Sequence, residues 1–256
     1  MKAGFVGLIG RPSCGKSTFL NRVCGAKVSI VSSVPQTTRN RIRGILNAPE
    51  GQLVFIDTPG FHLSEKKMNL YLRELAFATL KEVDAVLYLV DASRSPGEEE
   101  RALMATLAPY AGCLAVGINK IDIAGNLEAV QRELRQAFPA SPILPISALT
   151  GLGIAGLLEE LWRLAPEGEH LYPQDLYTDQ SPEFRIAEIV REKAILQTRE
   201  EVPHALYVEL SDLEMREEGR LLWARGFLCV ERESQKGILV GRNGERIRSI
   251  VRAAEE

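Results

Sequence analysis

The sequence has few cysteines, no long apolar run and no strong charge bias, and each shortage excludes a class of protein. Its four cysteines have neither the density of a disulfide scaffold nor the spacing of a metal site. No apolar stretch approaches the roughly 20 residues that span a bilayer, and the apolar start lacks the cleavage site of a signal peptide. The net charge of −3 gives no overall preference for nucleic acid. We therefore expect a cytoplasmic globular protein of one or two domains.

A glycine-rich loop lies between an apolar run and a segment of helical character. The run Ala3–Ile9 is typical of a buried strand, and residues 18–23 are typical of a helix. A strand, a glycine loop and a helix start form a phosphate-binding loop, in which backbone N–H groups and the helix dipole face a phosphate. An ordinary surface turn is the alternative. The predicted nucleotide-binding residues of this loop are Gly10, Arg11, Pro12, Ser13, Cys14, Gly15, Lys16, Ser17 and Thr18.

Several polar residues have the chemistry that a nucleoside triphosphate and Mg²⁺ require. Lys16 can reach the β- and γ-phosphates, and the Ser17 hydroxyl can bind Mg²⁺. A predicted strand ends at Asp57, whose carboxylate is expected to hold Mg²⁺ through a water molecule. We expect Thr37 or Thr38, preferably Thr38, to supply a second hydroxyl to Mg²⁺ and to belong to a nucleotide-sensitive switch. The segment Asp57, Thr58, Pro59 and Gly60 completes this set, with the Gly60 N–H directed at the γ-phosphate.

A second motif selects the base. The residues Asn119, Lys120, Ile121 and Asp122 follow an apolar strand. The Asp122 carboxylate can accept hydrogen bonds from the N1–H and 2-amino groups of guanine, which adenine lacks. Taken alone, this motif could be an ordinary polar loop cap. Together with the phosphate loop upstream, the motif predicts a guanine nucleotide site. Backbone N–H groups in the segment Ser147, Ala148 and Leu149 are expected to contact the guanine O6.

Strands and helices alternate through the first two thirds of the chain. This order predicts an α/β domain over residues 1–165, with a mostly parallel sheet covered by helices on both faces. Ligands of such sheets bind beyond the carboxyl ends of the strands, where these motifs occur. The expected strands are 3–9, 43–47, 52–56, 85–90, 113–118 and 143–146, and the expected helices are 18–23, 68–83, 97–110, 127–138 and 154–164.

The remaining residues follow a different pattern. Residues 166–182 lack a sustained period and are bounded by proline, which is typical of a linker. Residues 183–256 predict an α+β domain. Its expected elements are a helix over 183–200, strands over 205–210 and 221–231 around an acidic turn at 214–219, and two helical pieces joined by residues 237–244, the second over 245–254.

With these motifs in this order, the chain resembles the translation-factor-related branch of GTPases and, over its whole length, the Era family. The more specific marks are Gln36-Thr37-Thr38-Arg39 and the Gly-x-x-Gly of Gly241–Gly244. The resemblance implies a P-loop GTPase domain with a Ras-like sheet, which binds GTP and GDP with Mg²⁺. It also implies a cytoplasmic monomer that binds the 3′ end of 16S ribosomal RNA, assists assembly of the 30S subunit and associates peripherally with the inner membrane face.

The C-terminal region resembles a KH RNA-binding domain of type II. A tight Gly-x-x-Gly loop lets the backbone approach phosphates, and Lys236–Arg252 carries five basic residues against Glu245 alone. The alternative is an ordinary turn with a solvated basic helix face. A type II domain normally adds another strand, and the family a last helix, so we expect a C-terminally shortened domain, either truncated or naturally short. The predicted RNA-binding residues are Lys236, Gly237, Ile238, Gly241, Arg242, Asn243, Gly244, Arg246 and Arg248.

Two positions depart from related GTPases. Phe61 stands where Ras-like enzymes carry a glutamine that orients water, which predicts slow hydrolysis with water placed by backbone groups or a partner. Ser13 stands where related GTPases often carry an asparagine that helps hold an activating potassium ion, so potassium activation is in doubt. Two alternative functions stay open: an RNA chaperone with incidental GTP binding, and a GTPase that acts in RNA modification.

Overall fold

The chain forms two compact units in the computed structural model, which describes residues 1–32, 34, 37–63 and 67–255. One unit comprises Met1–Ser29 and Pro35–Asp179, and the other comprises Ile30–Val34 and Gln180–Glu256. Gln36, one mark of the family resemblance, lies outside the described residues. None of the helices in the described ranges is both long and apolar enough to cross a membrane.

The first unit is built on a sheet of six strands within the described residues, in the order β2-β3-β1-β4-β5-β6. β2 runs antiparallel to β3, and the other neighbouring strands are parallel. This order confirms the predicted mixed, mostly parallel sheet. The strands are β1 (Lys2–Ile9), β2 (Ile42–Ala48), β3 (Gly51–Asp57), β4 (Ala85–Asp91), β5 (Leu114–Asn119) and β6 (Ile143–Pro145).

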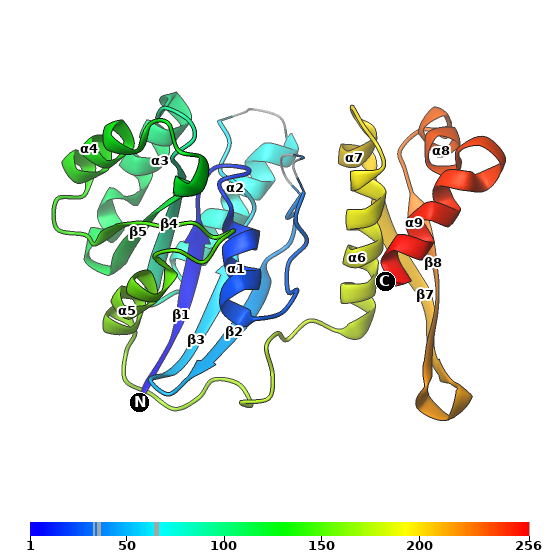
Figure 1. Ribbon diagram of the computed structural model, residues 1–256, viewed down its shortest axis with the longest axis horizontal. Coiled ribbons are helices and arrows are strands. Elements are labelled where there is room, and N and C mark those ends of the chain that lie inside the picture. The colour runs from blue at the N-terminus through cyan, green and yellow to red at the C-terminus, as the bar shows by residue number, and fades with distance from the viewer. Residues whose placement is uncertain (33, 35–36, 64–66, 256) are drawn as a thin grey trace. The chain divides into compact units, whose positions relative to one another are not determined.

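Helices cover both faces of this sheet (Figure 1). α1 and α5 lie on one face, and α2, α3 and α4 lie on the other, where their apolar residues join those of β1, β4 and β5 in one buried core. Leu103 and Leu107 of α3 are examples, since both are fully buried and lie one helical turn apart. The helices are α1 (Lys16–Cys24), α2 (Lys67–Leu80), α3 (Glu98–Leu107), α4 (Leu127–Ala137) and α5 (Ile154–Leu164).

The parallel strands bring the polar motifs to one edge of the sheet. β1, β4 and β5 run in the same direction as β3, so the residues that follow their carboxyl ends meet at a single edge. The phosphate loop follows β1, Asp57 ends β3 and Asn119 ends β5. The fold therefore gathers segments that lie far apart in the sequence, such as Lys16 and Asn119.

Residues 166–179, part of the expected linker, are ordered along β2 and β3. The Gln52 side chain accepts hydrogen bonds from the backbone N–H groups of Leu171 and Tyr172, at 2.7 and 2.8 Å. The backbone N–H of Ile45 donates to the Tyr177 carbonyl at 2.9 Å. These bonds explain why the first unit extends to Asp179.

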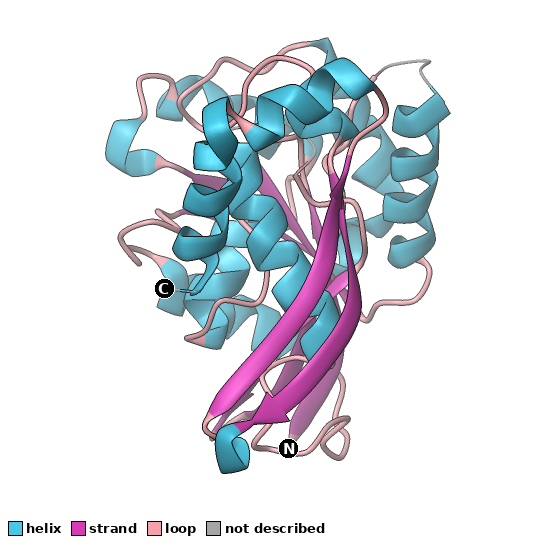
Figure 2. Ribbon diagram, turned by 90° about the vertical axis from the view of Figure 1, so that its right-hand side faces the viewer, coloured by secondary structure: helices cyan, strands magenta, loops and turns pink. Residues whose placement is uncertain are grey.

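The second unit packs helices against a two-stranded antiparallel sheet (Figure 2). Its core contains Ile195, Leu206, Leu239 and Ile250, against which Val34 also packs. The strands form a long twisted ribbon, which Figure 2 shows in magenta. The elements are α6 (Pro182–Leu196), α7 (Val202–Ala205), β7 (Tyr207–Arg216), the 3₁₀ turn η3 (Glu217–Gly219), β8 (Leu221–Cys229), α8 (Glu233–Val240), the 3₁₀ turn η4 (Arg242–Gly244) and α9 (Glu245–Glu255).

Three boundaries in this unit differ from those expected. The first helix ends at Leu196, and the Thr198 hydroxyl binds the Ala194 carbonyl at 2.8 Å beyond its end. β7 continues through residues 214–216, which we expected in a turn, because they pair with β8 and the Arg216 guanidinium stacks 3.8 Å from the Trp223 ring centroid. Residues 237–240 belong to α8 and not to a connecting loop.

Candidate guanine nucleotide site and Gly-x-x-Gly loop

The phosphate loop holds its lysine inward. Lys16 is buried, and its ammonium donates to the carbonyls of Gly10 and Arg11 at 3.0 and 3.1 Å. Gly15 has a φ of +102°, and a Cβ atom built on it lies 2.2 Å from the Asn119 amide nitrogen, so only glycine fits there. The charge of Lys16 is thus placed inside the loop by the backbone that surrounds it.

Asp57 is the centre of a buried cluster of hydroxyl groups. The hydroxyls of Ser17 and Ser29 donate to its Oδ2 at 2.7 and 2.9 Å, and the Ser17 and Thr38 hydroxyls are 3.1 Å apart. Burial raises the pKa of Asp57, although Lys16 and these hydroxyls partly offset the effect. Thr37 is also buried, but Thr38 is the threonine seen beside Ser17.

The same carboxylate has a free acceptor. Within the described residues, Asp57 Oδ1 is buried and has no hydrogen-bond partner. A buried, unpaired carboxylate oxygen beside two hydroxyl groups fits a hard divalent cation or its water shell, because such cations prefer oxygen ligands. The residues therefore fit Mg²⁺. Ser29 was missed in the sequence, since no spacing rule links it to Asp57.

The Asp57–Gly60 segment lies directly against the phosphate loop. A Cβ atom built on Gly60 lies 2.6 Å from the Pro12 nitrogen, so a larger residue cannot sit there without a shift. The Phe61 N–H donates to the Gly10 carbonyl at 3.0 Å, and the Thr58 hydroxyl donates to the Leu8 carbonyl at 2.7 Å. Pro59 lies between these two anchored residues.

Phe61 is turned into the core. Its side chain is buried, and its ring centroid is 5.8 Å from that of Phe77. A phenyl ring has no hydrogen-bonding group, and this one also faces away from solvent. Any orientation of water near the γ-phosphate must therefore come from other groups.

Asn119 connects the two segments predicted to read the base to the phosphate loop. Its amide nitrogen donates to the Cys14 carbonyl at 2.8 Å, and its amide oxygen accepts the Ala148 N–H at 2.8 Å. The Ser147 hydroxyl donates to Asp122 Oδ1 at 2.5 Å. The structure thus brings together the loop, the residues 119–122 and the residues 147–149.

Two residues that the sequence reasoning missed support this region. Asp91, at the end of β4, accepts a hydrogen bond from the Lys120 ammonium at 2.7 Å. Burial raises the pKa of Asp91, but hydrogen bonds from Lys120 and Ser93 outweigh it and hold the pKa below its usual range. Arg22 of α1 donates to the carbonyls of Ala148 and Leu149. Only the strand-end position of Asp91 could have signalled such a role.

The Gly-x-x-Gly loop of the second unit is open and partly braced by arginines. Asn243 and Gly244 both have positive φ angles, and Arg242 and Asn243 are exposed. Arg248 donates to the Asn243 carbonyl at 2.7 Å, and Arg246 donates to the Ile238 carbonyl at 2.5 Å. These bonds fix the backbone of the loop and of the end of α8.

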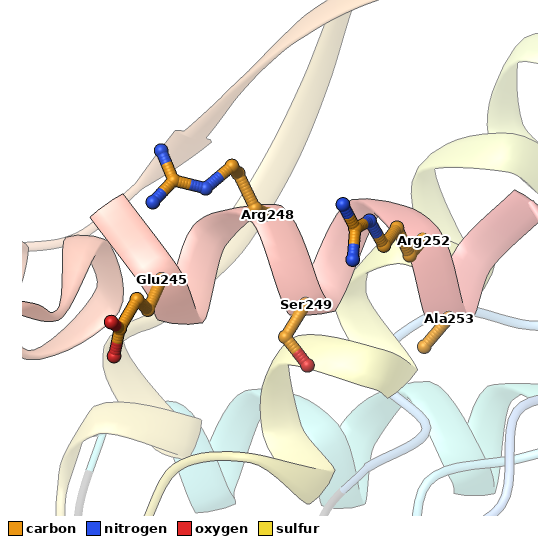
Figure 3. Close-up of a pocket in the computed structure, with 5 residues that line it drawn as sticks. All are labelled: Glu245, Arg248, Ser249, Arg252 and Ala253. Carbon is orange, nitrogen blue, oxygen red and sulfur yellow. The ribbon is translucent and has the colours of Figure 1, made fainter. Parts of the chain in front are cut away.

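The remaining predicted RNA-binding residues lie around this loop. Lys236 is exposed and pairs with Glu233 at 3.1 Å, and Gly237 and Ile238 lie beside it on α8. A hollow of about 400 Å³ runs along α9, and Figure 3 shows Arg248 and Arg252 projecting from the helix on one side. It is lined by Glu245, Arg248, Ser249, Arg252 and Ala253.

Comparison with known proteins assigns both units. A family model described as "50S ribosome-binding GTPase" matches residues 5–120, and a KH domain model matches residues 201–256. GTPase Era of Treponema denticola is 55% identical over 98% of this chain and 86% of the relative. The chain belongs to the Era family of GTPases. GTPase Era of Geobacter metallireducens is 44% identical over 99% of this chain and 86% of that relative.

Solved structures of Era share the fold across both units. A variant of Aquifex aeolicus Era bound to GDP and AlF₄⁻ matches with a TM-score of 0.93 and 36% identity, over 99% of this chain and 87% of the solved chain. An Era complex with MgGDPNP and nucleotides 1506–1542 of 16S ribosomal RNA matches equally well, with the same coverage. These matches confirm the predicted GTPase fold followed by a KH domain, and GTP hydrolysis is the activity of this Era-family chain.

Proposed function

We propose that this chain is a GTP-dependent switch that binds 16S ribosomal RNA near its 3′ end and assists assembly of the small ribosomal subunit. The observation that carries the proposal is the match, over 99% of the chain, to an Era structure that holds a GTP analogue and 16S ribosomal RNA together. The cytoplasmic location, the monomeric state and the association with the inner membrane face remain expectations of the family resemblance.

The nucleotide roles follow from the contacts at the sheet edge. Lys16 is assigned to the β- and γ-phosphates, because its charge is already held inside the loop. Ser17, Thr38 and Asp57 would hold Mg²⁺, which neutralises charge on the phosphates when bound. Gly60 is assigned to the γ-phosphate and Asp122 to the guanine edge. With Ser13 in the loop, we expect the same hydrolysis rate in sodium and in potassium salts.

The RNA role is assigned to the Gly-x-x-Gly loop and the basic residues beside it. Gly241 and Gly244 let the backbone turn tightly, and the exposed Arg242 and Asn243 at the tip of the loop can meet a phosphate. Arg246 and Arg248 add positive charge, which attracts the RNA backbone without reading its sequence. This pattern fits single-stranded RNA better than a duplex.

RNA affinity in two nucleotide states tests the switch. An oligonucleotide with the sequence of nucleotides 1506–1542 of 16S ribosomal RNA is titrated against the protein with Mg²⁺ and either a non-hydrolysable GTP analogue or GDP. We expect tighter binding with the analogue, because a ligand shifts an equilibrium only through different affinities for its states. Equal affinities would favour an RNA chaperone with incidental GTP binding. Binding to a modification substrate, but not to this oligonucleotide, would favour the RNA modification alternative.

A further inference from the structure

Glu99, in the first turn of α3, joins two segments of the nucleotide site. Its Oε2 accepts hydrogen bonds from the Arg11 guanidinium, at 3.1 Å from Nε and 2.8 Å from Nη2. Its Oε1 contacts the imidazole Nδ1 of His62 and accepts the Leu63 N–H at 3.2 Å. One carboxylate therefore links the phosphate loop to the residues that follow Gly60.

This cluster is shielded from solvent on its loop side. The side chains of Arg11 and Glu99 are 19% and 20% exposed, so their ion pair is less screened than a surface pair. Burial raises the pKa of Glu99, but hydrogen bonds from His62 and Arg11 outweigh it, and the carboxyl stays ionised at neutral pH.

The neighbouring residue fixes the cluster to the sheet. Glu100 is buried, accepts a hydrogen bond from the Tyr88 hydroxyl of β4, and lies 3.7 Å from Arg11 Nη1. Tyr88 is itself fully buried. The first turn of α3 therefore has a rigid support, and a residue held by it is held in a fixed place.

The position of the Gly60–Leu63 backbone matters because Phe61 cannot orient water. With that side chain in the core, only groups around it can set the geometry at the γ-phosphate. The Phe61 N–H holds this backbone to the loop at one point, and Glu99 holds it at the next two residues. We infer that Glu99 is a positioning residue for GTP hydrolysis, which fixes the Gly60–Leu63 segment against the phosphate loop through His62, Leu63 and Arg11. The inference rests on the proposed role of Gly60 but not on RNA binding.

The test separates turnover from nucleotide binding. Glu99→Gln keeps the shape of the side chain and removes its charge, and Glu98→Gln removes an exposed carboxylate one residue earlier in the same helix turn. We measure kcat and KM for GTP hydrolysis without RNA, the Kd for GDP and the melting temperature of each variant. We expect Glu99→Gln to lower kcat about 5- to 20-fold, because small misplacements of reacting groups reduce rates strongly. Its Kd for GDP should change less than about twofold, and Glu98→Gln should match the parent protein.

Other results would overturn the inference. A folded Glu99→Gln variant with unchanged kcat would show that the cluster has no part in turnover. A loss of GDP affinity with unchanged kcat would make Glu99 a purely structural residue of the loop. Should Glu99→Gln fail to fold, His62→Asn leaves the Arg11–Glu99 pair intact and must lower kcat without changing the Kd for GDP. An unchanged kcat in that variant would contradict the inference equally. Loss of RNA binding alone would concern only the proposed function.

Discussion

In the first unit, Lys16 and Asp57 of the nucleotide site are buried and hydrogen-bonded within the site, whereas the tip of the Gly-x-x-Gly loop in the second unit is exposed. Lys16 and Asp57 are 6% and 0% exposed, and each has two or more hydrogen bonds within the site. Arg242 and Asn243, in contrast, face solvent. The phosphate end of the nucleotide site is therefore preorganised, and the proposed RNA-binding surface is expected to gain its contacts mainly when RNA arrives.

This difference sets the size of the effects that substitutions should have. Removing a buried partner in the first unit breaks several bonds at once and leaves other groups unpaired, which costs more than the lost bond itself. Removing an exposed cation in the second unit loses one phosphate contact, which depends on salt and acts almost independently of its neighbours. The following substitutions probe this contrast, beginning with the largest expected effect.

Lys16→Ala should weaken GTP and GDP binding by more than about 100-fold, because charged hydrogen bonds to two phosphates are lost. Isothermal titration calorimetry with GDP and Mg²⁺ measures the loss. Lys81→Ala removes an exposed lysine of the same unit and should leave the affinity unchanged. Nucleotide affinity close to that of the parent protein in Lys16→Ala would refute the assignment of this loop.

Asp122→Asn should weaken GDP binding by about 30- to 100-fold, since a carboxylate that accepts two bonds from guanine becomes an amide. The same variant should bind xanthosine diphosphate better than the parent protein does, because xanthine presents a carbonyl where guanine has its amino group. Competition against a fluorescent nucleotide measures both. Asp175→Asn, in an exposed position, is the control, and an unaltered preference for guanine would rule out Asp122 as the base-reading residue.

Gly244→Asp should weaken RNA binding by about 10-fold or more while GTP hydrolysis stays near the parent rate. The substitution places a negative charge at the loop and forces a side chain onto a backbone with a φ of +74°. Gly219→Asp is matched to it, with a φ of +87° and the same added charge in the η3 turn. Filter binding at two salt concentrations measures the effect. Loss of GTP hydrolysis together with RNA binding would show that a change in the second unit also affects the activity of the first.

Arg22→Met should have the smallest effect, about a threefold weaker GDP affinity. Arg22 is exposed and reaches the site only through the carbonyls of Ala148 and Leu149, so its loss loosens the base-reading segment without removing a ligand contact. Arg163→Met removes an exposed arginine of α5 as the control. A loss of GDP affinity as large as that of Asp122→Asn would mean that residues 147–149 depend on α1 for their conformation.

The sequence predicted the fold of both units and the edge at which the motifs meet. Apolar periodicity is a local signal, and the strand-end position of each motif followed from parallel connections. The contacts between motifs could not be predicted, because they join residues far apart in the chain. Asn119, for example, contacts Cys14 and Ala148, and nothing in the Asn-Lys-x-Asp spacing indicates either partner.

Residues that support the site from outside the motifs could not be predicted from the sequence either. Ser29, Asp91 and Glu99 are common polar residues outside any motif, and only their placement beside Asp57, Lys120 and Arg11 gives them a role. In the second unit, the length of β7 was underestimated because the segment 214–219, with three glutamates and a glycine, is typical of a turn. Pairing with β8 and the stacking of Arg216 on Trp223 outweigh that local preference.

The path of the chain determines how the protein can be divided for experiments. Ile30–Val34 belongs to the second unit although it precedes most of the first in the sequence, and Val34 packs on the core around Ile195 and Leu239. The backbone N–H of Val31 also donates to the buried Glu192 carboxylate at 2.9 Å. A fragment that starts at Gln180 would lack this stretch and leave Glu192 without that donor. Co-expression of a peptide covering residues 28–36, or a fusion of it to the fragment, is the way to restore what truncation removes.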